Sequence, residues 1–221
     1  MGPEATRECF DSVIKHTPAK KDQDHLQVII DNNPQIPDRT EAILGEGKSP
    51  VPLLRRSARR LEKAGADFII MPCNTAHYFV DEVRKSVDIP ILDMVKATVN
   101  KLSPGSKTGL MATTGTIKTS IYQEYAQKGV DIITPSERYQ EIVMKVIYGK
   151  NGIKAGYKNE RLKKKLKVVA KHLKEKGVKS IIAGCTEIRL VLNQADLSDL
   201  DLITPIDVIA KKAVSRAKRE D

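Results

Sequence analysis

The sequence predicts an α/β fold of two pseudo-symmetric halves, each a three-layer domain with a mainly parallel sheet. The first observation is a repeat: segment 68–77, which reads FIIMPCNTAH, returns as segment 180–188, which reads SIIAGCTEI. The second is that a polar helical stretch ending in Gly, Gly65 or Gly177, precedes each copy. A Gly after the last helical turn and a short, branched apolar run are typical of a helix that leads into a buried parallel strand.

The first half is expected over residues 1–102. Its helices are predicted from Pro3 and over 51–64, 76–85 and 94–102, and its strands over 26–30, from Phe68 and over 89–92. Pro fits the first position of a helix. The apolar spacing of the first helix places Cys9 on its buried face, where a thiol usually acts as a small apolar residue.

Segment 103–106, which reads SPGS, is the predicted boundary, and the second half is expected over 103–207. Its strands are predicted over 108–111, over 130–133 and from Ser180, and its helices over 137–148 and within 158–179. A strand near 202 and a helix over 208–217 repeat the pattern of 89–102, and we expect the terminal helix, 208–221, to pack back on the first half.

Composition excludes several classes of protein. The chain has 221 residues, only 4% aromatic residues and a formal charge of +10. It shows no run of about 18 apolar residues and no basic-then-apolar leader, so we expect a cytoplasmic protein without a membrane segment. Many of the lysines fill one face of the helix within 158–179 with no aromatic residue between them, which favours a solvated face over nucleic-acid binding.

Two of the three cysteines have the same surroundings. An odd number of cysteines without Cys-x-x-Cys or His-x-x-x-His spacing predicts neither a disulfide framework nor a metal site. Cys73 and Cys185 each follow a predicted strand, and Asn74, Thr75 and Thr186 are predicted to cap the helix that comes next. The ends of parallel strands form the crevice where ligands bind, and a helix amino terminus favours a thiolate.

Three other segments could supply ligands to that crevice. Arg39 lies in a loop at a strand's carboxyl end, although a lone loop arginine is more often simply exposed. The hydroxyl-rich turn 113–116 (Thr113, Thr114, Gly115 and Thr116) offers donors that would fit a carboxylate. Lys154, in the glycine-rich loop 149–156, is a second cation for an acidic substrate or part of a mobile surface loop.

Two thiols on opposite sides of a small cleft suit racemisation at a carbon next to a carboxylate. One thiolate removes a proton and the other thiol delivers one to the opposite face. The ordinary pKa of Cys, about 8.5, allows both forms near neutrality once it is slightly lowered. No cofactor signature is present, so we expect direct proton transfer with the carbanion stabilised by donors at the carboxylate.

The segments MGPEAT, PDRT, MPCNTAH, ATTGT, GIKAG and AGCTEI together resemble the cofactor-independent aspartate/glutamate racemase superfamily, most closely its aspartate racemases. The resemblance covers essentially the whole chain. It implies two α/β domains, a substrate in the cleft between them, Cys73 and Cys185 as the acid/base pair, and a homodimer.

The resemblance also implies the roles of other residues. The α-carboxylate would be held by Asn74, Thr75, the turn 113–116 and Thr186, and the side-chain carboxylate by Arg39 and Lys154. Met1, Gly2 and Pro3 would lie beside the substrate. Glu187 stands where glutamate racemases usually carry His, which favours an acidic amino acid, aspartate, as the substrate.

The sequence departs from the pattern of this superfamily at one point. Members of this superfamily usually begin with a short strand and two glycines ahead of the Met-Gly-Pro turn, whereas this sequence starts at Met1. That strand normally lies inside the first sheet, and its loss would leave neighbouring strands unpaired. Our hypothesis is that the natural start lies upstream.

Other functions stay open at this point. Within the superfamily they are a racemase of broader or other specificity, for glutamate or hydantoins, and a maleate isomerase. A two-domain binder of small molecules without chemistry is the alternative of a different class, and it predicts that neither thiol matters for proton exchange.

Overall fold

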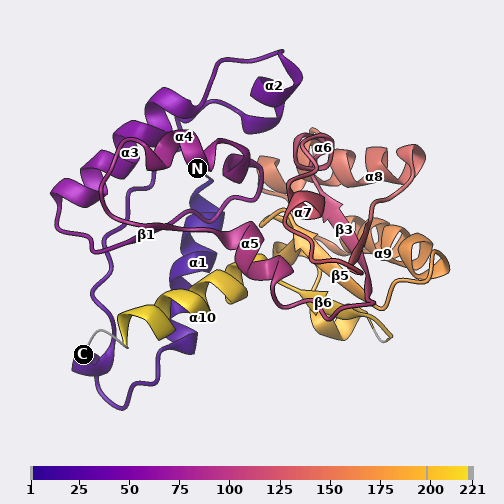
Figure 1. Ribbon diagram of the computed structural model, residues 1–221. Coiled ribbons are helices and arrows are strands. Elements are labelled where there is room, and N and C mark those ends of the chain that lie inside the picture. Colours follow the sequence, from indigo (N-terminus) through magenta and orange to yellow (C-terminus); the bar gives the residue numbers. More distant parts are fainter. Residues whose placement is uncertain (1, 198, 219–221) are drawn as a thin grey trace. The chain divides into compact units, whose positions relative to one another are not determined.

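The computed structural model describes residues 2–197 and 199–218. The chain divides into two compact units, which are described separately: unit 1 comprises residues 1–97 and 206–221, and unit 2 residues 98–205. Both contain helices and strands (Figure 1), and every strand pair among the described residues is parallel, as the sequence predicts.

Unit 1 is built around a short parallel pair of strands. Its elements are α1 (Pro3–His16), η1 (Asp22–Asp24), α2 (Arg39–Leu44), α3 (Val51–Lys63), β1 (Ile69–Ile70), η2 (Thr75–Phe79), α4 (Val80–Arg84), β2 (Ile91–Leu92), α5 (Met94–Val99, which continues into unit 2) and α10 (Pro205–Ala217). Ile69 pairs with Ile91, and Ile70 with Leu92. Cys9 of α1 is buried in one cluster with Ile209 and Ala213 of α10, so these two helices share a core.

Unit 2 has the larger sheet, with strand order β4-β3-β5-β6. Its elements are β3 (Lys107–Ala112), α6 (Thr114–Lys118), α7 (Ile121–Glu124), β4 (Asp131–Ile133), α8 (Glu137–Tyr148), η3 (Ile153–Ala155), α9 (Glu160–Glu175), β5 (Ser180–Gly184), η4 (Ile188–Leu190), η5 (Gln194–Asp196) and β6 (Asp201–Ile203). Helices α8 and α9 pack on each other, and both contact β3. One apolar cluster joins them to β5 and to Cys185.

The helix boundaries confirm the prediction that Gly65 and Gly177 end helices. Gly65 follows α3 with φ of 89°, and Gly177 follows α9 with φ of 86°. These are left-handed conformations, which a residue with a Cβ adopts only at a cost. The lysine-rich helix α9 buries the apolar stripe that its spacing predicts, namely Leu162, Leu166, Val169, Ala170 and Leu173.

Two predicted elements differ in the structure. Segment 26–30 is not a strand, and Val28, Ile29 and Ile30 remain exposed. A strand requires a hydrogen-bonded neighbour, and β1 pairs only with β2 among the described residues. The helix predicted over 76–85 begins as the 3₁₀ helix η2 and becomes α-helical at Val80. None of the described helices combines the length and apolar character needed to cross a membrane.

Candidate active site

Cys73 lies just beyond the carboxyl end of β1, in the turn that leads to η2. Its backbone N–H donates to the carbonyl oxygen of Met71 at 2.8 Å, which fixes the turn. The side chain is half-buried and packs against the apolar core around Ile69 and Phe79. Helix α2 also contacts η2, so the segment that carries Arg39 lies next to the turn of Cys73.

The two polar residues after Cys73 are almost completely buried, but they do not cap the next helix as expected. Asn74 occupies the N-cap position of η2 with φ and ψ of −57° and −53°, and its side chain makes no capping hydrogen bond. A capping side chain requires an extended backbone at this position, whereas Asn74 is already helical. Thr75 is the first residue of η2.

His77 ties the Cys73 turn to the start of α5, a role that the sequence analysis missed. The backbone N–H of Met94 donates to Nε2 at 3.0 Å, and Nδ1 lies 2.8 Å from the carbonyl oxygen of Cys73. Because Nε2 accepts a hydrogen bond, Nδ1 must be the protonated nitrogen, and the ring is neutral. Burial accordingly lowers the pKa of His77, although Asp93 opposes this shift. The only signal in the sequence is the position of His77 four residues after Cys73, within the same motif.

Replacing His77 by Ala should lower the free energy of unfolding by about 2 to 4 kcal/mol, because it leaves Met94 N–H and the Cys73 carbonyl buried without this partner. Urea unfolding measures the loss. The loss should shrink below pH 6.5, the ordinary pKa of His. Below this pH, His77 is protonated in the unfolded chain but stays neutral in the folded protein, so the wild type itself becomes less stable. His25→Ala, at an exposed site, should change stability by less than about 0.5 kcal/mol. An equal loss in the two variants would contradict this role of His77.

Arg39 is the first residue of α2, and it is buried rather than exposed. One nitrogen of its guanidinium, Nη1, donates to the carbonyl oxygens of Ile36 at 3.1 Å and Pro37 at 2.9 Å. The alternative interpretation of Arg39, an exposed arginine in a loop, is therefore wrong. These two bonds hold the guanidinium in the loop beside α2.

In unit 2, Cys185 forms a chain of polar contacts with Glu187 and Lys154. It follows β5 directly and is buried. Its Sγ donates to Oε2 of Glu187 at 3.0 Å, and Nζ of Lys154 lies 3.4 Å from Oε1 of the same carboxylate. Lys154 also lies 4.9 Å from the centre of the Tyr148 ring. Lys154, the predicted second cation, and Cys185, the second thiol, therefore both contact the carboxylate of Glu187.

The charges in this chain set the protonation states. Burial and the charge of Glu187 raise the pKa of the Cys185 thiol well above its ordinary value, and Lys154 only partly opposes them. Burial also acts to raise the pKa of Glu187, but Lys154 and the hydrogen bonds from Cys185 and Thr186 prevail and lower it. The expected lowering of the thiol pKa by a helix terminus is therefore wrong for Cys185. Only the three-residue 3₁₀ turn η4 follows it, and the nearest charge is negative.

Thr186 joins the same carboxylate instead of capping a helix. Its hydroxyl donates to Oε2 of Glu187 at 2.9 Å, and Glu187 itself holds the N-cap position of η4. Glu187 therefore accepts from a thiol and a hydroxyl on one oxygen and faces an ammonium group on the other. The cap predicted at Thr186 is wrong because the carboxylate of the next residue offers a charged acceptor.

The hydroxyl-rich turn 113–116 follows β3 as predicted. The Thr113 side chain caps α6 by accepting from the backbone N–H of Thr116 at 3.3 Å, and the two hydroxyls lie 3.2 Å apart. Thr114 is the more accessible residue, and its hydroxyl accepts from the side-chain amide of Gln140 at 3.3 Å. Gly115 is buried in the first turn of α6.

At the start of the chain, Pro3 is the first residue of α1, as predicted, and Gly2 is its N-cap. Met1 lies outside the described residues. Burial raises the pKa of Cys9 to about 12, which agrees with the buried, unreactive thiol expected in the first helix. No group of three or more His, Cys, Asp or Glu side chains within 2–197 and 199–218 could hold a metal ion.

Comparison with known proteins gives a consistent result. The family model for Asp/Glu/Hydantoin racemase matches residues 1–213. The structure of Picrophilus torridus aspartate racemase is 27% identical, with a TM-score of 0.79 over 97% of this chain and 90% of that one. A broad specificity amino-acid racemase of Bacillus subtilis is 26% identical over 97% of this chain and 94% of its own length.

A more distant similarity is to glutamate racemase of Aquifex pyrophilus, which is 26% identical over 68% of this chain and 58% of its own length. The family model covers both thiols, their repeated strand ends and the carboxylate beside Cys185. By its fold, its paired motifs and this match, the chain belongs to the Asp/Glu/Hydantoin racemase family.

Proposed function

We propose that this amino-acid racemase acts on aspartate without a cofactor, with Cys73 and Cys185 as its two acid/base groups. The observation that carries the proposal is the hydrogen bond from the Cys185 thiol to Glu187 at the end of β5. It keeps a proton on a sulfur atom at the carboxyl end of a parallel strand, where ligands bind in α/β sheets. Cys73 occupies the repeated position in unit 1, after β1.

In the proposed reaction the thiols face the substrate's Cα from opposite sides. The Cys73 thiolate takes the Cα proton, and the Cys185 thiol delivers its own proton to the other face. Cys73 then holds a proton and Cys185 is the thiolate, which is the state that converts the opposite enantiomer. Glu187 lies within hydrogen-bonding distance of Cys185, so it is the group through which a proton can return to that sulfur.

The carbanion formed between these steps needs donors at the α-carboxylate, because a thiolate alone is too weak a base for this proton. Thr114 supplies the more accessible hydroxyl of its turn, and Asn74, Thr75, Thr113, Thr116 and Thr186 complete the proposed set. Gly2 and Pro3 extend the site at the start of α1.

Specificity for aspartate rests on Arg39 and Lys154. Lys154 pairs with the carboxylate that accepts a hydrogen bond from Cys185, and Arg39 lies on α2, the helix that contacts η2. An acidic side chain would compete with the carbonyl oxygens of Ile36 and Pro37 for Arg39. The similarity to an aspartate racemase along 97% of the chain supports the same substrate, and the resemblance to that branch supports a homodimer.

A racemase of broader specificity is the second candidate. The similarity to the broad specificity enzyme of Bacillus subtilis, which extends over 97% of the chain, favours it. Glu187 also neutralises Lys154, which would leave Arg39 as the main determinant for a second carboxylate. The two candidates differ in how strongly the enzyme prefers aspartate over a neutral amino acid.

Arg39→Leu should reduce kcat/KM for aspartate by about 10- to 100-fold and change that for alanine far less, because one charged hydrogen bond contributes about 1.5 to 3 kcal/mol. Chiral chromatography of both amino acids measures this. Arg55→Leu is the matched control, since Arg55 also donates to a backbone carbonyl, that of Glu82, but lies on the surface. Equal losses for aspartate and alanine in Arg39→Leu would support the broad specificity racemase instead.

A further inference from the structure

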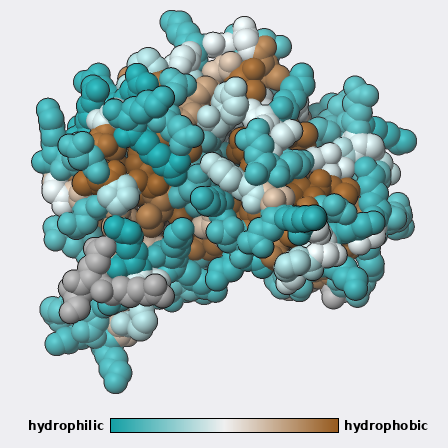
Figure 2. Space-filling model, viewed as in Figure 1, coloured by the Kyte–Doolittle hydropathy of each residue, from teal (hydrophilic) through white to brown (hydrophobic). Residues whose placement is uncertain are grey.

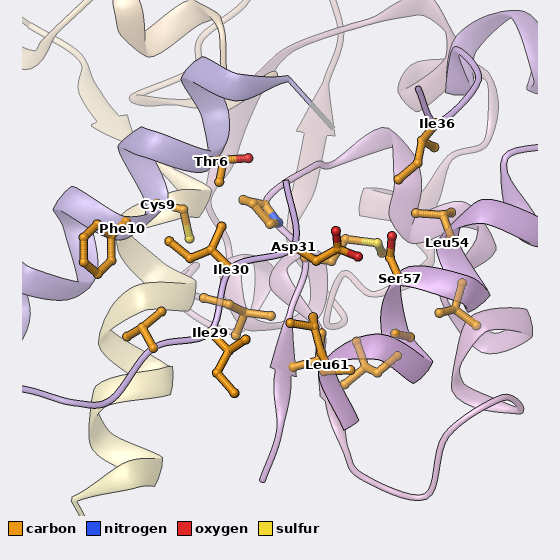
Figure 3. Close-up of a pocket in the computed structure, with 18 of the residues that line it drawn as sticks. Thr6, Cys9, Phe10, Ile29, Ile30, Asp31, Ile36, Leu54, Ser57 and Leu61 are labelled. Atoms are coloured by element: carbon orange, nitrogen blue, oxygen red, sulfur yellow. The ribbon is translucent and has the colours of Figure 1, made fainter. Parts of the chain in front are cut away.

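The apolar hollow of unit 1 does not suit the polar substrate of the proposed reaction. Its walls are mainly apolar side chains, among them Cys9, Ile30, Leu54 and Leu61 (Figure 3). Asp31 is the only charged residue that lines it among the described residues, and its charge would repel an acidic amino acid. Figure 2 shows a brown, apolar area on the surface of unit 1 among hydrophilic residues. An amino acid placed in such surroundings loses its hydration without replacement, so the hollow provides no second site for this substrate.

In unit 2, by contrast, one face of α8 contacts groups that the proposed reaction uses. Gln140, Met144 and Tyr148 are spaced four residues apart and share this face. Gln140 and Met144 both contact Thr114, and the Tyr148 ring lies 4.9 Å from Nζ of Lys154. Helix α8 also packs on α9 and contacts β3. The core of unit 2 therefore holds this face in place beside two of the proposed substrate-binding residues.

The side-chain amide of Gln140 sets the direction of the Thr114 hydroxyl. Its Nε2 donates to the backbone carbonyl oxygen of Ala112 at 3.0 Å and to Oγ1 of Thr114 at 3.3 Å. The carbonyl oxygen can only accept, so it determines which end of the amide is the nitrogen. Because Oγ1 accepts a hydrogen from that nitrogen, the proton of the hydroxyl itself must point away from Gln140. The Thr114 hydroxyl is thus set to donate to a further group.

Thr114 is the residue of its turn best placed to donate to a ligand. The side chains of Thr113 and Thr116 are buried, and their hydroxyls lie 3.2 Å apart. Thr114 is more exposed, and its backbone N–H donates to Sδ of Met144 at 3.2 Å, so α8 holds both its backbone and its side chain. The charge of a carbanion spreads onto the α-carboxylate, so a donor already aimed there stabilises the transition state more than the bound substrate.

We propose that Gln140 is a positioning residue of the racemase, which through its hydrogen bond to Thr114 aims the hydroxyl proton at the α-carboxylate of the substrate. This role rests on the proposed function, because it requires an α-carboxylate at Thr114. Gln140 itself does not touch the substrate. Since every amino acid carries an α-carboxylate, the contribution of Gln140 should be the same for each amino acid that the enzyme racemises, unlike that of Arg39.

Gln140→Met keeps the length of the side chain but removes the amide. It should lower kcat for aspartate about tenfold or more and change KM by less than about threefold, because the aimed hydroxyl acts mainly in the transition state. Thr114→Val, which removes the hydroxyl itself, should lower kcat by about 10²-fold. Chiral chromatography measures both constants, and any other amino acid that the wild type racemises should show the same factors.

The double variant Gln140→Met/Thr114→Val separates positioning from structural damage. If Gln140 acts through Thr114, its replacement should add no more than about twofold to the loss in Thr114→Val. A general shift of the turn would also displace Thr113 and Thr116, and the two losses would then multiply.

Gln194→Met is the matched control. The Gln194 amide also donates to backbone carbonyl oxygens, those of Leu197 at 3.3 Å and Leu200 at 3.0 Å, but it belongs to another element of unit 2, η5. Its replacement should lower the urea midpoint at least as much as Gln140→Met does and leave kcat unchanged. If Gln140→Met does not fold, Gln140→Glu keeps the shape of the side chain. Its carboxylate would accept the hydroxyl proton and turn it from the substrate, so the same loss and the same double-variant result are expected.

Several outcomes would overturn the positioning role. They are an unchanged kcat in Gln140→Met, losses that multiply in the double variant, and an equal fall of kcat in Gln194→Met. Failure of the proposed function gives a different result: a wild type that neither racemises aspartate nor exchanges its Cα hydrogen with deuterated water. That result would remove the function and the role of Gln140 together, whereas an active wild type with an equally active Gln140→Met removes only the latter.

Discussion

Cys73→Ser and Cys185→Ser should each reduce racemisation of aspartate by about 10² to 10⁴-fold, the usual contribution of a positioned acid or base. A serine hydroxyl holds its proton too tightly to replace a thiolate. In deuterated water, wild type should incorporate deuterium at Cα while it forms the opposite enantiomer. Each variant keeps one of the two proposed acid/base thiols, so residual deuterium exchange should occur without inversion, and only from the enantiomer that presents its hydrogen to that sulfur. The two variants should therefore prefer opposite enantiomers.

Cys9→Ser is the matched control for this experiment. Cys9 is buried in α1, and its pKa of about 12 keeps it protonated, so its replacement should leave exchange and inversion coupled as in wild type. Exchange that persists in Cys73→Ser and Cys185→Ser with unchanged inversion would exclude the two-thiol mechanism. Absence of exchange in wild type with every amino acid tested would favour a binding protein without chemistry.

Much of the fold could be predicted because the sequence contains the same pattern of helix, glycine, strand and cysteine twice. The paired glycines Gly65 and Gly177 end helices, and the apolar runs after them form β1 and β5, as their branching indicates. These features depend on residues close in sequence. The failure at segment 26–30 has a different cause: its residues favour a strand, but a strand forms only beside a partner, and no described residue supplies one.

The local chemistry of the site was harder to predict, because it also depends on contacts that form only in the folded protein. The sequence placed Cys185 correctly at the end of a strand but assigned its environment to a helix terminus. The decisive neighbours are Glu187, which is adjacent, and Lys154, which comes from a loop far away in sequence. His77 was missed because its two partners, Cys73 and Met94, lie on separate elements. A pairing across elements depends on tertiary structure, which residue spacing does not reveal.

The protonation of Cys185 should respond in opposite directions to its two charged neighbours. Glu187→Gln removes the negative charge and should lower the pKa of the thiol, although burial still holds it above the ordinary value. Lys154→Met removes the opposing positive charge and should raise the same pKa further. Because only the thiolate reacts with iodoacetamide, alkylation at pH 8 should become about tenfold faster in the first variant and about tenfold slower in the second.

These rates are best measured with Cys9 and Cys73 replaced by Ser, so that Cys185 is the single thiol. Lys145→Met is the matched control: Lys145 pairs with Glu141 at 3.1 Å, but both side chains are largely exposed, and its loss should leave the rate unchanged. The double variant Glu187→Gln/Lys154→Met should lie between the two single variants, because the opposing charges are removed together. Faster alkylation in Lys154→Met would mean that the ammonium group closes access to the sulfur rather than tuning its proton.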